Sequence, residues 1–158
     1  MLAVGRVHLW QGGSLWIGRG HGRSDWHDHH ALQIALALDG VCMFRSRADG
    51  SWSEFQGAIV RSHRHHQFEV EGATMAQLFI EPDTVEGRLL LERYVDDISP
   101  LPEVQRLAMA QLLGDAHRTG HLVEGESLAE DVLEVERYPP RQRLQRQHPD
   151  ELAESRFD

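Results

Sequence analysis

Two short clusters of histidines are the residues whose types and spacing could do chemistry. They hold six of the eleven histidines in the chain, namely His27, His29 and His30 in the first cluster and His63, His65 and His66 in the second. Imidazole nitrogens bind divalent transition metals and also form hydrogen bonds with small ligands. The two clusters therefore predict a metal site or a polar binding pocket, provided that the fold brings them together.

The first cluster lies at the start of the segment Trp26–Gly40, which alternates as a β-strand does. With a period of two, one face carries His27, His29, Ala31, Gln33, Ala35 and Ala37, and the other carries His30, Leu32, Ile34, Leu36 and Leu38. A buried helix over Ala31–Leu38 is the alternative, because Ala and Leu favour helices. The regular alternation and the Asp39-Gly40 turn favour the strand. The aliphatic face must then pack on other elements, and the His/Gln/Ala face suits a cavity.

The same period selects one histidine of the second cluster. His66 shares a side with the apolar Phe68 and Val70, whereas His65 lies on the polar side of that segment. We therefore expect four side chains to converge on one interior cavity: His27, His29, Gln33 and His66. Trp26 stands next to them in the sequence and is a candidate to stack on a bound ligand at the mouth of the cavity. The alternative is a Trp that packs in the core or at its rim.

These residues carry a resemblance to a known family. The residues His27, His29, Gln33 and Gly40 resemble the first cupin motif. That motif has His-x-His, then three residues, an acidic or amide residue, six residues and Gly. More narrowly, HDHHALQIALALDG, AIVRSHRHHQF and FIEPDTVEGRLL resemble the N-terminal sensing domain of bacterial AraC-type transcriptional regulators. The resemblance covers about residues 20 to 95. It implies a jelly-roll barrel, with His66 as the histidine of the second cupin motif.

The resemblance also implies a metal site, with departures from the family pattern. Two histidines from one strand, a third from another and the oxygen of Gln33 would suit Zn, Fe, Mn or Ni. The usual residue at position 33 is Glu, and the neutral Gln33 amide binds a hard cation less well than a carboxylate. The segment from Gly57 to His66 also lacks the Pro and Gly usual in the second motif. The alternative is a polar pocket that binds an effector without a metal.

Composition sets limits on the partners. The chain has a formal net charge of −9 and a sequence pI near 5.6, so we expect no direct nucleic acid binding by this segment. Cys42 is the only cysteine, which fits a reducing, cytoplasmic setting. The sequence contains no long apolar run, so we expect neither a signal peptide nor a membrane span.

Short strands separated by glycine turns fill the first half of the chain, and helix signals follow from Pro82 onward. We expect an α+β fold with a cupin-like β-barrel over residues 1–82, a helical extension over residues 83–138 and a charged tail or linker over residues 139–158. The glycines at positions 18, 20 and 22 predict a loop. Asp83 is the expected cap of the first helix.

Two functions from different classes remain open. The first is a small-molecule-sensing domain of an AraC-type regulator, whose helix-turn-helix DNA-binding part is not in this chain. A sensor binds its effector, so for this function we expect no catalytic residues. The second is a small metal-dependent cupin enzyme of the oxygenase or isomerase type. In either case we expect a homodimer, because the Leu32–Leu38 face and the helical stripes at Leu89/Leu90 and Val104/Leu107/Leu112 are apolar. The alternative is a monomer whose helices fold back on their own barrel and cover that face. No helix-turn-helix pattern lies in residues 141–158. For the regulator, we expect either that the sequence is a fragment of a longer protein or that the DNA-binding part has been lost.

Overall fold

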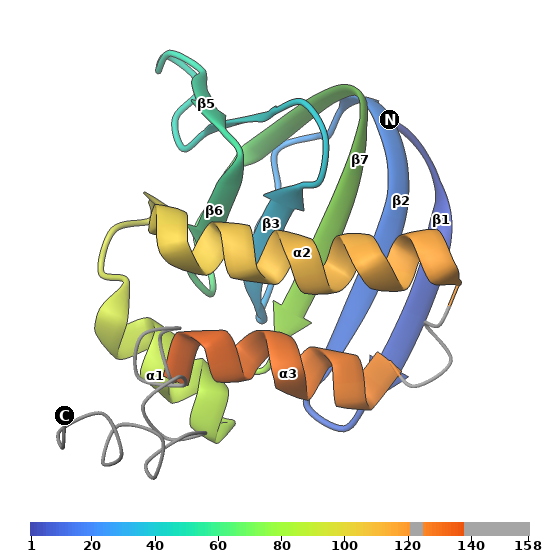
Figure 1. The fold of residues 1–158 in the computed structure, drawn as a ribbon. Helices are drawn as coiled ribbons and strands as arrows, with labels where there is room; N and C mark the ends of the chain where they lie inside the picture. Colours follow the sequence, from blue (N-terminus) through green and yellow to red (C-terminus); the bar gives the residue numbers. More distant parts are fainter. Residues whose placement is uncertain (121–124, 138–158) are drawn as a thin grey trace, which may run out of the picture.

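The structure is a computed structural model that describes residues 1–120 and 125–137. Its strands are β1 (Leu2–Trp10), β2 (Gly13–Arg23), β3 (Leu32–Ala37), β4 (Cys42–Arg45), β5 (Ser53–Phe55), β6 (Gly57–Val60), β7 (Gln67–Ile80) and β8 (Ile98–Pro100). Its helices are α1 (Val85–Arg93), α2 (Glu103–Thr119) and α3 (Gly125–Arg137) (Figure 1). Strands come first and helices after, as the sequence predicts. The one strand among the helices, β8, had no clear sequence signal.

The strands form one antiparallel sheet in the order β1-β2-β7-β3-β6-β8, with β4 on β7 and β5 on β4. The hairpin between β1 and β2 turns at Gln11-Gly12, where Gly12 has φ +98°. The predicted loop over residues 18–22 is wrong, because β2 continues through it to Arg23. A Cβ on Gly18 would lie 2.2 Å from the carbonyl oxygen of Val4. The glycine there permits close approach of two strands rather than a turn.

Strand β7 is the centre of the sheet and pairs with three other strands. Its first half pairs with β4 and its second half with β3, while β2 runs along its other side. Glu71-Gly72 has the composition of a turn, but β7 continues through it as one strand with a register shift opposite residues Arg19–His21. A bulge of this kind bends a strand without ending it. Both ends of β7 can therefore contribute to the same cavity.

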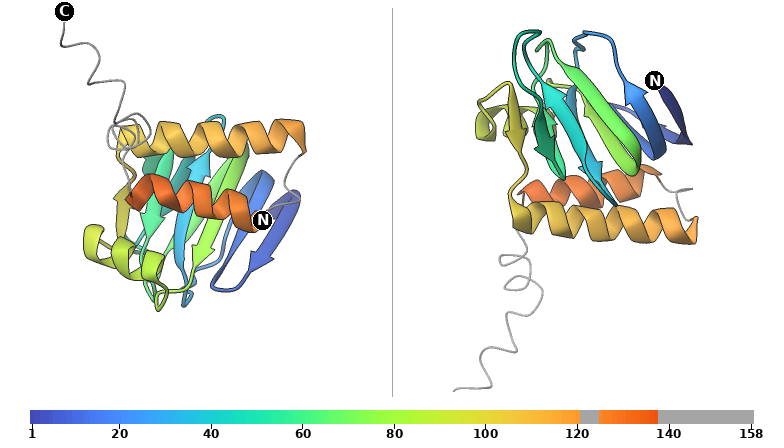
Figure 2. Two further views of the ribbon diagram at one scale, coloured as in Figure 1. Left: turned by 60° about the horizontal axis from the view of Figure 1, so that its bottom comes forward. Right: turned by 90° about the horizontal axis from the view of Figure 1, so that it is seen from above.

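The two faces of β3 pack into different cores. Leu32, Ile34 and Leu36 are fully buried against helical residues that include Leu90, Met109 and Val132. The other face, with Ala35 and Ala37, packs inside the barrel with Phe44, Val60, Phe68 and Met75. Figure 2 shows α2 and α3 on the same side of the sheet. The aliphatic face of β3 is thus covered by the helices of its own chain.

A side-chain cap begins α1, and polar contacts join α3 to the end of α1. Thr84, not Asp83, caps α1: its hydroxyl accepts a hydrogen bond from the Gly87 amide at 3.0 Å. On α3, the buried Glu136 carboxylate accepts from Arg93 at 2.7 Å and from the Tyr94 hydroxyl at 3.0 Å. No helix in the described part of the chain is long and apolar enough to cross a membrane. The predicted tail over residues 139–158 lies outside the described residues.

Candidate functional site

The two histidine clusters meet beside the start of β3. The His27 amide donates to the His66 carbonyl oxygen at 3.2 Å, and the His66 amide donates to the His27 carbonyl oxygen at 2.9 Å. This two-bond bridge fixes the two segments to each other. The strand itself begins only at Leu32, so His27 and His29 lie on the irregular segment before it. The backbone bridge, rather than the alternation of side chains along a continuous strand, brings these two histidines to the cavity.

Each of the three rings is oriented by a hydrogen bond to the backbone. One nitrogen, Nδ1, lies next to a carbonyl oxygen two residues away: His27 to Asp25 at 2.8 Å, His29 to Ala31 at 2.7 Å and His66 to Arg64 at 2.8 Å. Since a carbonyl oxygen only accepts, each Nδ1 carries the proton. The lone pair of each neutral ring is then on Nε2. A backbone carbonyl that fixes the tautomer in this way is the usual support of a metal-binding histidine.

The three rings form one group, which we call the His triad: His27, His29 and His66. One nitrogen from each ring lies within 4.8 Å of the others. Metal–nitrogen bonds of 2.0–2.1 Å place the ligand atoms of a tetrahedral site about 3.4 Å apart, so nitrogens at the full 4.8 Å would have to approach by about 1 Å to share an ion. That is a change of side-chain torsion, because the backbone is already bridged.

His66 is the most buried member of the triad. Its side chain has no exposed surface, and its Nε2 has no hydrogen-bond partner among the described residues. Burial lowers the pKa of His66 to about 4, against the opposing effect of its bond to the Arg64 carbonyl. The ring is therefore neutral at pH 7, and its buried lone pair is free to bind a cation or a donor group.

Gln33 completes the site with a second amide, Gln77. The Gln33 Nε2 donates to the Gln77 Oε1, and both residues are at most 7% exposed. The Gln33 Oε1 lies 3.1 Å from His29 Nε2. With the proton of His29 on Nδ1, these two atoms are both acceptors. A cation bound to both atoms would stabilise this arrangement, and so would a rotated pair of amides in which Gln33 donates to His29. The donor set thus fits a metal ion without requiring one.

The triad opens into a cavity of about 330 Å³ inside the barrel. Its lining has aromatic and apolar side chains, the two amides and two of the three histidines: Met1, Ala3, Trp16, Ser24, His27, His29, Gln33, Phe68, Gln77 and Phe79. None of these described residues has a side chain with a carboxylate, an amine or a guanidinium, and Met1 brings the N-terminal amino group. Gln77 and Phe79 were not picked out from the sequence, although they alternate in MAQLFI as an inward face would.

The remaining predicted residues lie outside this cavity. Trp26 does not line it, and the Arg45 guanidinium lies 5.4 Å from the centroid of its ring. His30 and His63 contact each other at 2.9 Å on the surface, and His65 lies 3.3 Å from the Asp28 carboxylate. These contacts agree with the expectation that His30 and His65 point away from the site.

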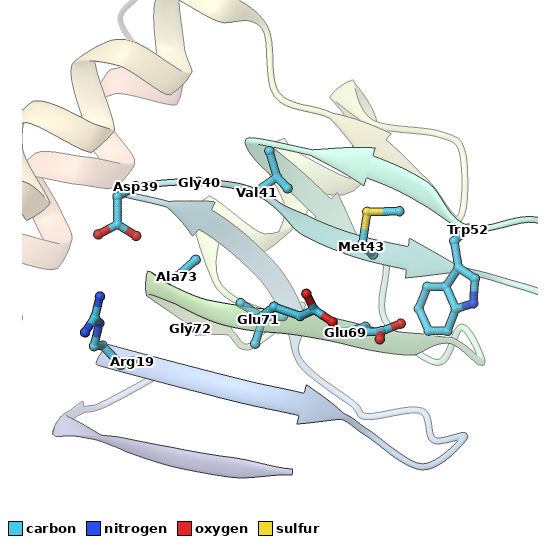
Figure 3. A pocket seen from close by; sticks show the side chains of 11 residues that line it. Arg19, Asp39, Gly40, Val41, Met43, Trp52, Glu69, Glu71, Gly72 and Ala73 are labelled. Atoms are coloured by element: carbon cyan, nitrogen blue, oxygen red, sulfur yellow. The ribbon is translucent and has the colours of Figure 1, made fainter.

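A larger hollow of about 630 Å³ lies elsewhere, between the start of β4 and the end of β2 (Figure 3). Arg19 and Asp39 stand at one end and Trp52 at the other, with Met43 and Glu71 between them. Its lining contains no histidine and no member of the triad. Size alone therefore does not identify the site, and the convergence of ligand atoms favours the smaller cavity.

No protein-family model matches this sequence, and no curated protein matches it. Proteins of known structure do match its fold. The AraC-like transcriptional activator CuxR matches with a TM-score of 0.56 and 8% identity, over 79% of this chain and 49% of CuxR. This is a cupin fold. The chain spans about half the length of CuxR, and the match to CuxR is long enough to include helices as well as the barrel.

Two further matches are limited to about half of the chain. A cupin-2 domain-containing protein from Shewanella frigidimarina has 12% identity and a TM-score of 0.42, over 49% of this chain and 79% of its own. A cupin domain from Bordetella pertussis has 13% identity and a TM-score of 0.40, over 50% of this chain and 93% of its own. The strands and helices of the structure, together with the longer match to CuxR, confirm the cupin-like barrel and the C-terminal helices predicted from the sequence.

Proposed function

We propose that this chain is a small-molecule-sensing cupin domain of an AraC-type transcriptional regulator. The effector binds in the 330 Å³ cavity, held by the His triad and Gln33 directly or through a divalent transition metal. The observation that carries the proposal is the set of three backbone-oriented imidazoles beside a cavity whose other lining side chains are uncharged. The fold shared with CuxR, which extends beyond the barrel, supports the regulator class over the general cupin class.

The lining of the cavity favours binding over proton transfer. General acid–base chemistry needs a titratable group within hydrogen-bond reach of the substrate. Among the side chains around the cavity only the triad could supply one, and His66 stays neutral because burial lowers its pKa to about 4. Trp16, Phe68 and Phe79 instead offer flat apolar surface, and Gln77 offers an amide. These groups suit a small ligand with an aromatic or apolar body and one polar end.

A metal ion, where bound, would be held by His27, His29 and His66, with the Gln33 oxygen as a further ligand. It would supply an attachment point for an anionic oxygen of the effector. Four neutral ligands leave the full charge of a divalent ion uncompensated. Gln33, where the cupin pattern has Glu, therefore favours an anionic effector such as a carboxylate.

A second candidate is a small metal-dependent cupin enzyme of the oxygenase or isomerase type. The lone pair of His66, buried and without a hydrogen-bond partner in the described residues, is the observation that favours it. The two candidates differ in what happens to the ligand. A sensor returns its effector unchanged, whereas an enzyme consumes it.

The test is a thermal-shift titration with small aromatic carboxylates such as benzoate and salicylate, in EDTA and with one equivalent of Zn²⁺ or Ni²⁺. At least one probe should stabilise the protein and be recovered unchanged by mass spectrometry. Gln77→Leu should abolish the shift, and Gln56→Leu, at an exposed position outside the cavity, should retain it. Turnover of the probe by wild type but not by His66→Ala would establish the enzyme instead. No shift with any probe, or equal shifts in both variants, would refute effector binding in this cavity.

A further inference from the structure

The edge strand β1 is unlike the other edges of the sheet. It is nine residues long and pairs only with β2 among the described strands. The opposite edge, β8, has three residues and contains Pro100, which cannot donate a backbone hydrogen bond. Strand β5 is also three residues long and carries the charge of Glu54. Short strands, Pro and charged side chains usually protect an edge strand from pairing with another chain. Strand β1 is long, has no Pro and has one such charge, at Arg6.

The side chains of β1 are apolar and exposed on both of its faces. Of the nine large apolar residues with high exposure in the described chain, five lie in residues 1–9: Met1, Leu2, Val4, Val7 and Leu9, between 60% and 79% exposed. Arg6 is the only Arg, Lys, Asp or Glu in the strand. A long, apolar edge with free backbone groups is a template for another strand.

The helices offer much less apolar surface. The aliphatic face of β3 is covered by the chain's own helices, and Leu112 packs partly buried against the same core. Of the apolar helical residues named from the sequence, Val104 and Leu107 remain exposed, at 53% each. The apolar surface available to a partner is therefore concentrated at β1 rather than on α2.

We propose that β1 pairs antiparallel with β1 of a second copy, which joins the two sheets into one. A second copy is the occupant because the edge is self-complementary: it carries apolar residues at both ends and a single charge near its middle. A two-fold axis perpendicular to the sheet sets residues of the same parity opposite each other. Centring the pair on Gly5 uses all of residues 1–9, and places Val4 opposite Arg6 of the partner subunit. Centring it on Arg6 would oppose two like charges.

This pairing brings the partner to the edge of the effector cavity. Met1 and Ala3 line the cavity, and Val7 lies on the same face because it pairs with Trp16. In the register centred on Gly5, Val7 of the partner subunit lies beside Ala3. The dimer thus extends one wall of the cavity with a residue from the other subunit. The pairing itself does not depend on the proposed effector or on a metal.

The test is sedimentation equilibrium of the whole chain with a charge-reversal set at the Val4–Arg6 pair. Wild type should be a dimer of about twice 18.0 kDa. Val4→Lys opposes two cations across the axis and should weaken the dimer at least tenfold, whereas Val4→Glu should preserve it. The double variant Val4→Lys/Arg6→Glu should restore it. Since Val4 is 71% exposed in the subunit, each variant should keep the wild-type circular dichroism spectrum.

Leu107→Lys is the matched control on the helical surface and should leave the mass unchanged. A wild-type mass of 18.0 kDa at every concentration would overturn the proposal. Equal dissociation of Val4→Lys and Val4→Glu would overturn the register. Dissociation by Leu107→Lys, with Val4→Lys still dimeric, would move the interface to α2 and refute pairing through β1.

Discussion

Replacing Gln33 by Glu should change the stability of the protein in opposite directions without and with a metal ion. In wild type, the Gln33 Nε2 donates to Gln77 Oε1, and both amides are buried. A carboxylate at position 33 has no hydrogen to donate, so the wild-type hydrogen bond to Gln77 is lost unless the Gln77 amide rotates to donate in its place. It also buries a charge, which the neutral His66 does not compensate. In EDTA, Gln33→Glu should therefore be less stable than wild type.

The magnitude follows from the loss of one buried hydrogen bond. Leaving a buried polar group unsatisfied costs about 1–3 kcal/mol. For a chain of 158 residues, each kcal/mol lowers Tm by roughly 2–4 °C, so Gln33→Glu should melt about 2–12 °C lower in EDTA. With a divalent ion in the triad, the added carboxylate becomes an anionic ligand. A ligand at a hundred times its Kd stabilises by about 2.7 kcal/mol, and the tighter Kd of the variant should enlarge that gain.

The assay is differential scanning calorimetry of both proteins in EDTA and over a Zn²⁺ or Ni²⁺ titration. Gln56→Glu, at an exposed position, is the matched control for added charge and should behave as wild type. The reasoning fails if Gln33→Glu has the wild-type Tm in EDTA, or if metal raises both Tm values equally.

Three further predictions concern the scaffold. Arg93→Ala leaves the carboxylate of Glu136, 1% exposed, without its cation, and should cost about 3–5 kcal/mol in urea unfolding; a loss below 1 kcal/mol would show that the ion pair does not hold α3. Leu36→Ala, at a fully buried position between β3 and the helices, should cost about 2–5 kcal/mol, and a near-neutral result would contradict the helix-covered core. Burial raises the pKa of the Cys42 thiol to about 12, so Ellman's reagent at pH 8 should react with Cys42 only after unfolding. Rapid reaction of the native protein would show that the interior of the barrel is open.

Much of the barrel could be predicted because its strands have local signals. The alternation around Leu32–Ala37 and the glycine turn at Gly12 are each set by a few neighbouring residues. Strand β2 could not be placed correctly, because its glycines serve the close approach of β1 at Val4. That role depends on pairing between segments, which no local pattern contains.

Four residues of the candidate site were predictable from the sequence, but the contact that brings them together was not. Period two selected His27, His29, Gln33 and His66, and the structure brings these four side chains close together. The first two are not on β3, and the backbone bridge between His27 and His66 positions them instead. Gln77 was missed because a buried Gln in an apolar strand has no motif. Only the position of Gln33 on the neighbouring strand gives Gln77 its role.

The central claim is that the three imidazoles of the His triad form one shared binding site. The absorption spectrum of bound Co²⁺ tests this claim most directly. Titration of the metal-free protein with Co²⁺ should give visible ligand-field bands that saturate at one equivalent. His66→Ala should abolish the bands, whereas His65→Ala, at the exposed neighbouring position, should keep the wild-type spectrum. The account predicts that contrast. Equal spectra for His66→Ala and wild type would contradict a shared site at His27, His29 and His66.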